Sequence, residues 1–193
     1  MMVDPLTAML RQLPKSALIV IIGNPYTYSF HIGLELIKRA YLNFRWYLFI
    51  NDVTQRYAEI IRQYGIIKSD INFINDLCRG AITLDDVLRV DGNLAYVVIN
   101  SDSSCIDDYN KVLSKRDPSV ESTVVIQIDE AYYKSIAYLA DLIIKLGIVE
   151  DAYSFKTISR LAKLTLVRGG ATELSVSYSI MPNEVLFKEF TRI

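Results

Sequence analysis

The apolar run Ala17-Leu18-Ile19-Val20-Ile21-Ile22, followed by Gly23-Asn24-Pro25-Tyr26-Thr27-Tyr28-Ser29-Phe30, decides how this sequence is interpreted. An uninterrupted β-rich apolar run is typical of a strand that is covered on both faces, as in a parallel sheet. A helical pattern starts at Phe30, so the glycine and the proline stand in a strand-to-helix turn. This layout is typical of a phosphate-binding loop.

The residues that would hold a phosphate are missing from this turn. A working loop reads G-x-x-x-x-G-K-[ST]: the glycines let backbone N–H groups close on the phosphates, the lysine neutralises charge and the hydroxyl holds magnesium. Here Gly23 fills the first position, Tyr28 stands at the second glycine, Ser29 replaces the lysine and Phe30 replaces the hydroxyl. A bulky residue resists the backbone angles that the second glycine supplies. The local pattern alone therefore favours a plain turn, capped by Thr27 or Ser29, over phosphate binding.

Strands and helices alternate along the following residues. Strand patterns cover 45–50, 94–99, 124–128 and 142–146, with a weak one at 70–77, and helical patterns stand between them at 54–64, 83–88, 106–115 and 132–140. Strand-like segments then follow one another at 155–167, 174–180 and 185–190, which is typical of hairpins. This order predicts one α/β domain over 1–193: a mainly parallel twisted sheet flanked by helices on both faces (core about 16–148), with a C-terminal antiparallel hairpin region (about 153–190).

Composition and charge exclude several classes of protein. The formal net charge of -1 argues against a general nucleic-acid or membrane surface. The longest apolar runs are too short to cross a bilayer. The N-terminal segment has no basic region ahead of an apolar core, so we expect no signal peptide and a cytoplasmic location.

The sequence offers little for a metal centre. His31 is the only histidine, and Cys78 and Cys105 are far apart without a CxxC spacing. We therefore expect two reduced, buried or half-buried cysteines, no metal and no cofactor.

Several segments, taken in order, resemble the cores of RecA-superfamily ATPases, and most closely the small archaeal KaiC-like proteins of the RadA-paralogue type. The loop 23–30 is in register with that family's G-x-P-G-T-G-K-T and keeps its Gly, Pro and Thr. Four further segments resemble the family's second strand, its magnesium strand, its Ala-Asp strand entry and its hairpin Lys-x-Arg-Gly motif: 47–52, 95–101, 138–143 and 166–169. The resemblance covers about residues 16–190 and implies a RecA-like fold.

The resemblance also implies catalytic positions that this chain has changed. Where the family has two acidic residues that activate water, this chain has Asn51 and Asp52; where it has a magnesium-linked aspartate, this chain has Asn100. The hairpin lysine is Leu166, whereas Arg168 is kept. Because phosphoryl transfer needs charge at several of these points together, the resemblance predicts a catalytically inactive pseudo-ATPase.

We therefore expect a protein-interaction or regulatory subunit that binds its own kind or a RecA/RadA-type ATPase, with a dimer favoured. The resemblance places it in DNA recombination or repair. Tyr26 and Tyr28 are expected to fill the phosphate pocket or to contact a partner, and Arg168 to reach the loop of a neighbouring subunit.

Two alternatives stay open on the sequence. A divergent pocket could bind nucleotide without the lysine, but it would need a basic residue near the loop, supplied by Arg168 or by a neighbouring subunit. A small DNA-binding protein would use the C-terminal basic residues Arg160, Lys163 and Arg168, the first and last of which strand alternation places on one face.

Overall fold

The computed structural model describes residues 4–50, 55–66, 71–74, 80–99, 105–150, 153, 157–168 and 172–189. The remnant acidic positions Asn51, Asp52 and Asn100 lie outside the described residues, so their predicted roles stay predictions.

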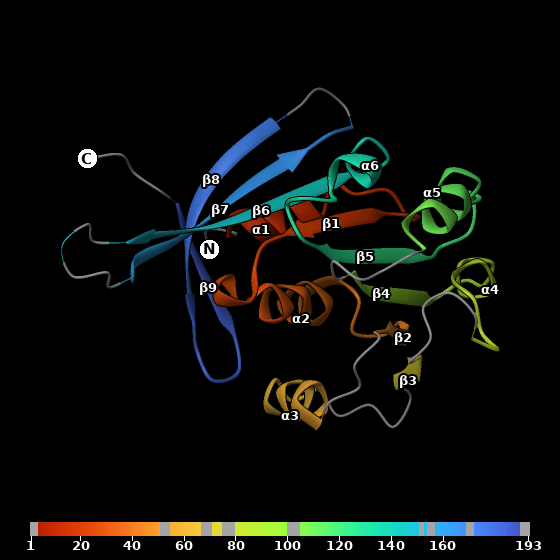
Figure 1. The fold of residues 1–193 in the computed structure, drawn as a ribbon, viewed down its shortest axis with the longest axis horizontal. Helices are drawn as coiled ribbons and strands as arrows, with labels where there is room; N and C mark the ends of the chain where they lie inside the picture. The colour runs from red at the N-terminus through yellow and green to blue at the C-terminus, as the bar shows by residue number, and fades with distance from the viewer. Residues whose placement is uncertain are drawn as a thin grey trace.

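The described residues form a nine-stranded sheet in the order β3-β2-β4-β5-β1-β6-β7-β8-β9 (Figure 1). All neighbouring strands from β3 to β6 are parallel, and those from β6 to β9 are antiparallel. The strands are β1 (Leu18–Ile22), β2 (Arg45–Phe49), β3 (Ile71–Ile74), β4 (Asn93–Ile99), β5 (Thr123–Ile128), β6 (Leu142–Glu150), β7 (Thr157–Leu166), β8 (Thr172–Ile180) and β9 (Val185–Glu189). The predicted α/β fold with C-terminal antiparallel strands is confirmed.

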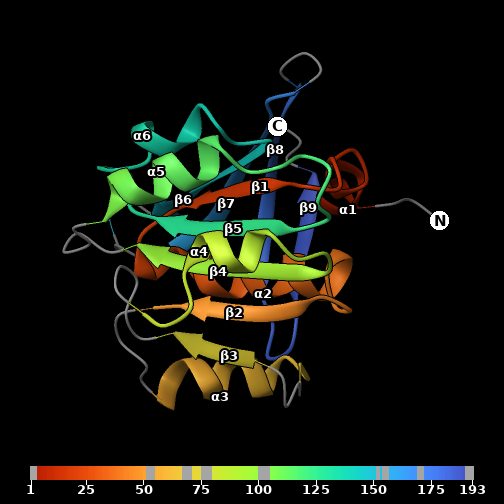
Figure 2. The same cartoon turned by 90° about the vertical axis from the view of Figure 1, so that its right-hand side faces the viewer.

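Helices cover both faces of the parallel part of the sheet. Figure 2 shows α4, α5 and α6 in front of the strands and α2 behind them. The helices are α1 (Pro5–Leu10), α2 (Ser29–Ala40), α3 (Gln55–Gln63), α4 (Leu84–Leu88), α5 (Ile106–Ser114) and α6 (Lys134–Ala137), and a short 3-10 turn, η1 (Pro25–Thr27), precedes α2. Within the described part of the chain, every helix is too short or too polar to span a membrane.

The central strand β1 is buried at all five positions because it serves two cores. Ile19 and Ile21 pack on the side of α1, α2 and α3, whereas Leu18, Val20 and Ile22 pack on the side of α4, α5 and α6. Successive side chains of a strand point to opposite faces. A continuous apolar run therefore has to be covered on both sides, as the sequence predicts.

The last strand, β9, is fixed to α2 by a buried polar cluster. The Glu35 carboxylate accepts a hydrogen bond from the backbone N–H of Val185 (2.8 Å) and another from Nε of Arg39 (2.7 Å). Arg39 also donates to the backbone oxygen of Val185 (3.0 Å) and forms an ion pair with Asp4. Segments near both ends of the chain thus meet on one helix.

Three elements differ from the sequence-based expectation. Strand β6 extends to Glu150, four residues beyond the expected 142–146. Helix α1 was not predicted, although Asp4 caps it by accepting from the Thr7 backbone N–H and Pro5 occupies its first turn, both common signals of a helix start. Helix α6 covers 134–137 rather than 132–140, with hydrogen-bonded turns on either side of it.

Candidate functional site

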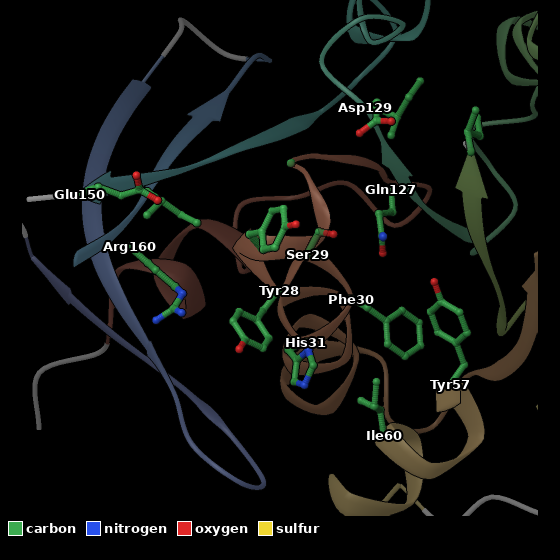
Figure 3. A pocket seen from close by; sticks show the side chains of 15 residues that line it. Tyr28, Ser29, Phe30, His31, Tyr57, Ile60, Gln127, Asp129, Glu150 and Arg160 are labelled. Carbon is green, nitrogen blue, oxygen red and sulfur yellow. The ribbon is translucent and has the colours of Figure 1, made fainter. Parts of the chain in front are cut away.

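A cavity of about 590 Å³ opens at the carboxyl ends of β1, β4 and β5, beside the first turn of α2 (Figure 3). Its size is typical of a site for a small ligand. The walls come from the phosphate-loop position (Gly23, Tyr26, Tyr28, Ser29, Phe30, His31), from α3 (Tyr57, Ile60), from the ends of β4 and β5 (Ile99, Gln127, Ile128, Asp129) and from β6 and β7 (Ile148, Glu150, Arg160).

The loop is held tightly at Gly23 and Thr27. A Cβ atom on Gly23 would lie 2.4 Å from Oγ1 of Thr27 and 3.1 Å from Cβ of Leu146, so no larger residue fits there. The Thr27 hydroxyl donates to the backbone oxygen of Asn24 (2.6 Å), and the Tyr178 hydroxyl donates to the backbone oxygen of Thr27 (2.7 Å). Gly23 is thus required for close packing, and Thr27 stabilises the turn rather than capping the helix.

Tyr28 has a left-handed backbone, with φ 56° and ψ 42°, and is the N-cap of α2 without a capping side-chain hydrogen bond. The expectation that Thr27 or Ser29 caps this helix is therefore wrong. Tyr28 adopts a backbone conformation that favours glycine, although its side chain disfavours it by about 1–2 kcal/mol. The loop thus holds a tyrosine in a backbone conformation that glycine adopts more readily.

The Tyr28 ring lies between Arg160 and His31. The guanidinium carbon of Arg160 is 4.9 Å from the centre of the ring, and the His31 ring meets its edge at 5.1 Å. Arg160 is partly buried, its Nε has no hydrogen-bond partner, and it makes no ion pair with any described residue. The sequence suggested Arg160 only as a nucleic-acid contact and did not reveal its place in this cavity.

Phe30 turns away from the loop into the core. It is 6% exposed and meets the rings of Tyr57 and Tyr96 edge-on, at 4.7 Å and 5.4 Å between ring centroids. The Tyr96 hydroxyl in turn donates to Oε1 of Gln127 (2.9 Å). Phe30 points inward, whereas Tyr26 is 77% exposed and the Tyr28 ring forms part of the cavity wall. The prediction that Tyr26 and Tyr28 fill the phosphate pocket or contact a partner stays a prediction.

The charges around the cavity are mixed. Among its described lining residues, Arg160 is positive, Asp129 and Glu150 are negative, and none is a lysine. Ser29, which the sequence resemblance aligns with the lysine of a phosphate-binding loop, is 3% exposed. The described lining therefore carries more negative than positive charge.

Arg168 and Lys163 lie elsewhere and have partners within the chain. Lys163 pairs with Glu173 (2.9 Å), and Nε of Arg168 is 2.6 Å from Oδ1 of Asp141. The wholly buried Asp141 also accepts from the backbone N–H of Leu18, at the start of β1. Arg168 is therefore at the end of β1 opposite to the loop, and its predicted approach to a neighbouring subunit's loop stays a prediction.

Neither metal-binding clusters nor a reduced thiol appear in the described ranges. No three His, Cys, Asp or Glu side chains gather there as a metal site would require. Cys105 is buried and disulfide-bonded, so the expectation that it is reduced is wrong. Cys78 lies outside the described residues.

Comparisons with known proteins bear on the fold. No protein-family model and no curated protein matches the chain. A KaiC-like protein from the hyperthermophilic archaeon Pyrococcus horikoshii has a similar structure, with a TM-score of 0.65 and 9% identity over 91% of each chain. The flagellar accessory protein FlaH from Methanocaldococcus jannaschii is similar with a TM-score of 0.65 and 12% identity, over 96% of this chain and 95% of that one. The fold is thus the RecA/KaiC-type fold that the sequence predicted.

Proposed function

We propose that this chain is a catalytically inactive RecA/KaiC-like protein that acts as a protein-interaction or regulatory subunit. The observation that carries the proposal is the state of the phosphate loop. Ser29 brings no charge where the lysine should be, and Phe30 packs into the core where a hydroxyl should hold magnesium. Both losses remove transition-state stabilisation that phosphoryl transfer requires.

The electrostatics of the cavity support the same proposal. Among the described lining residues, the carboxylates of Asp129 and Glu150 outnumber the one cation, Arg160. A nucleoside triphosphate would bring several more negative charges to these carboxylates, and like charges at short range disfavour binding.

The partner role rests on surface and fold. Tyr26 exposes 77% of its surface next to the loop, and tyrosine is a common anchor at protein interfaces. One solved structure with this fold is that of a flagellar accessory protein. We propose the chain itself or a RecA/RadA-type ATPase as the partner, and DNA recombination or repair as the process, on the family resemblance.

An ATP hydrolysis assay tests the proposal. Purified protein with ATP and Mg²⁺ is expected to release no phosphate above the buffer rate. Turnover that disappears in Asp52→Ala would sink the inactive assignment, because it would show that the remnant acidic position still activates water.

Direct DNA binding is the weaker alternative. Of the three basic residues proposed for it, Lys163 and Arg168 have acidic partners and Arg160 lines the cavity. We expect fluorescence anisotropy with single-stranded DNA to give weak binding that falls steeply between 50 and 200 mM salt, as a purely electrostatic contact does. Tight binding that persists at the higher salt would favour this alternative.

A further inference from the structure

The cation in the cavity wall lacks an anion. Arg160 is partly buried, lies over Tyr28 and has neither an ion pair nor a partner for its buried Nε among the described residues. A partly desolvated guanidinium is costly unless its charge and its N–H groups are matched. This group lines an open cavity, so an anionic group of a ligand in the cavity would meet it.

A second polar side chain lies in the same cavity. Ser29 is 3% exposed and lines the cavity. Figure 3 shows its hydroxyl on the side of Gln127. Ser29 begins α2, whose first N–H groups have no partner within the helix and attract negative charge.

The same cavity limits how much negative charge the ligand carries. Asp129 and Glu150 stand in its wall, and Arg160 is the one Lys or Arg among its described lining residues. Tyr28 also occupies, with its side chain, the position where a phosphate loop needs a glycine. Aromatic rings from Tyr28, Phe30 and Tyr57 provide apolar surface beside the donors.

We propose that this cavity binds a small aromatic molecule that carries a single oxyanion group, either a carboxylate or a phosphate monoester. The oxyanion accepts hydrogen bonds from Arg160, the Ser29 hydroxyl and the first turn of α2, and the ring packs against the aromatic wall. The inference shares with the proposed function only that the site does not process a triphosphate. It does not need the protein partner.

The test is isothermal titration of the full chain with four probes at equal ionic strength. Phenyl phosphate and benzoate combine a ring with one oxyanion group. Benzamide has the ring without a charge, and Mg–ATP carries a triphosphate with several negative charges. We expect phenyl phosphate or benzoate to bind, and the better of the two identifies the oxyanion. Benzamide and Mg–ATP are expected to bind at least about tenfold more weakly, since a hydrogen bond to a charged group is worth about that factor or more.

Three variants that each remove one charge sharpen the test; two of them are on β7 and one is on β6. Arg160→Gln should weaken the better probe about tenfold or more. The matched control is Lys163→Gln, which also replaces a cation of β7 by glutamine. Lys163 pairs with Glu173 outside the cavity, so this change should leave binding unchanged. Glu150→Gln should tighten binding, because it removes a negative charge from the cavity wall.

Three results would overturn the inference. These are no binding of either oxyanion probe to the wild type, equal binding to Arg160→Gln, and tighter binding of Mg–ATP than of both probes. Should Arg160→Gln not fold by circular dichroism, a failure of Glu150→Gln to tighten binding overturns it instead. Phosphate release from ATP would count against the proposed function, whereas the titrations address the ligand alone.

Discussion

The guanidinium of Arg160 lies 4.9 Å from the centre of the Tyr28 ring, and Tyr28 is the non-glycine residue with a positive φ in the described part of the chain. A cation over an aromatic ring at this distance is attracted by about 0.5–2 kcal/mol. That range is similar to the cost of the left-handed backbone at Tyr28. The C-terminal antiparallel strands therefore contribute directly to the conformation of the loop that follows β1.

The proposed interface predicts the effect of Tyr26→Ser. Tyr26 is 77% exposed at the loop, so its loss should raise the dissociation constant of a dimer about tenfold or more, and leave the Arg160–Tyr28 contact in place. Light scattering over a concentration series measures the change, with circular dichroism to show that the fold is intact.

The matched control for this interface is Tyr138→Ser, which removes a 69% exposed tyrosine from the end of α6. Its association should equal that of the wild type. A wild-type chain that is strictly monomeric at high concentration and captures no partner from cell extract would contradict the interface.

The buried carboxylate of Glu35 predicts a large loss of stability in Glu35→Ala. The change leaves Arg39 and the N–H of Val185 without their buried acceptor, which we expect to lower the free energy of unfolding by about 3 kcal/mol. Urea denaturation measures the difference. The control is Glu59→Ala, which removes an exposed carboxylate 3.9 Å from the Arg62 guanidinium and should not change the urea midpoint measurably. Similar effects in both variants would contradict the stabilising role of the buried polar cluster around Glu35.

The contact between α2 and β4 predicts that Gly33 cannot be enlarged. A Cβ on Gly33 would lie 2.1 Å from the Tyr96 hydroxyl oxygen and 2.4 Å from its ring, and that ring is buried. Gly33→Ala should therefore lower the free energy of unfolding by about 1–3 kcal/mol. Thermal denaturation checks this against Gly147→Ala, where the added Cβ would have no atom within 4 Å; an equally stable Gly33→Ala variant would refute the close contact.

Burial of Tyr41 predicts a loss of stability in alkali. Desolvation raises the pKa of the Tyr41 hydroxyl from 10.0 to about 12 in the folded chain. The unfolded chain therefore loses this proton first, and the free energy of unfolding falls as the pH rises from about 10 to about 12, by about 1.4 kcal/mol per pH unit. Below pH 10 the contribution of Tyr41 is constant.

Tyr41→Phe should flatten the alkaline limb of a plot of stability against pH, because phenylalanine has no proton to lose. Urea denaturation at several pH values between 9 and 12 gives that plot. An unchanged slope in the variant would mean that other groups account for the whole alkaline loss.

The strands could be predicted from the sequence because their patterns are local. The apolar run 17–22 has to be a strand covered on both sides, and the burial of Leu18 to Ile22 follows from that alone. Helix α2 likewise follows from the apolar spacing that begins at Phe30 and from the basic residues Lys38 and Arg39 in its last turn.

The candidate site could be predicted only in part because it depends on contacts between distant strands. That Gly23 and Ser29 lie at a strand-to-helix turn follows from the sequence. The entry of Arg160 into the cavity does not, since it depends on the register and twist of β7 against β6. The left-handed backbone of Tyr28 could not be predicted from the sequence either, because it opposes the local preference of tyrosine and is imposed by its surroundings.

The hydrogen bond between Glu35 and Val185 joins residues 150 positions apart, and it has a consequence for synthesis on the ribosome. At about 5–20 residues per second, helix α2 emerges many seconds before its acceptor side chain can meet β9. During that interval Glu35 can pair with Arg39 on its own helix but not with β9, and the sheet is incomplete. We therefore expect this domain to complete its folding only after β9 has left the ribosome, and chaperones that shield apolar surfaces to engage the chain before then.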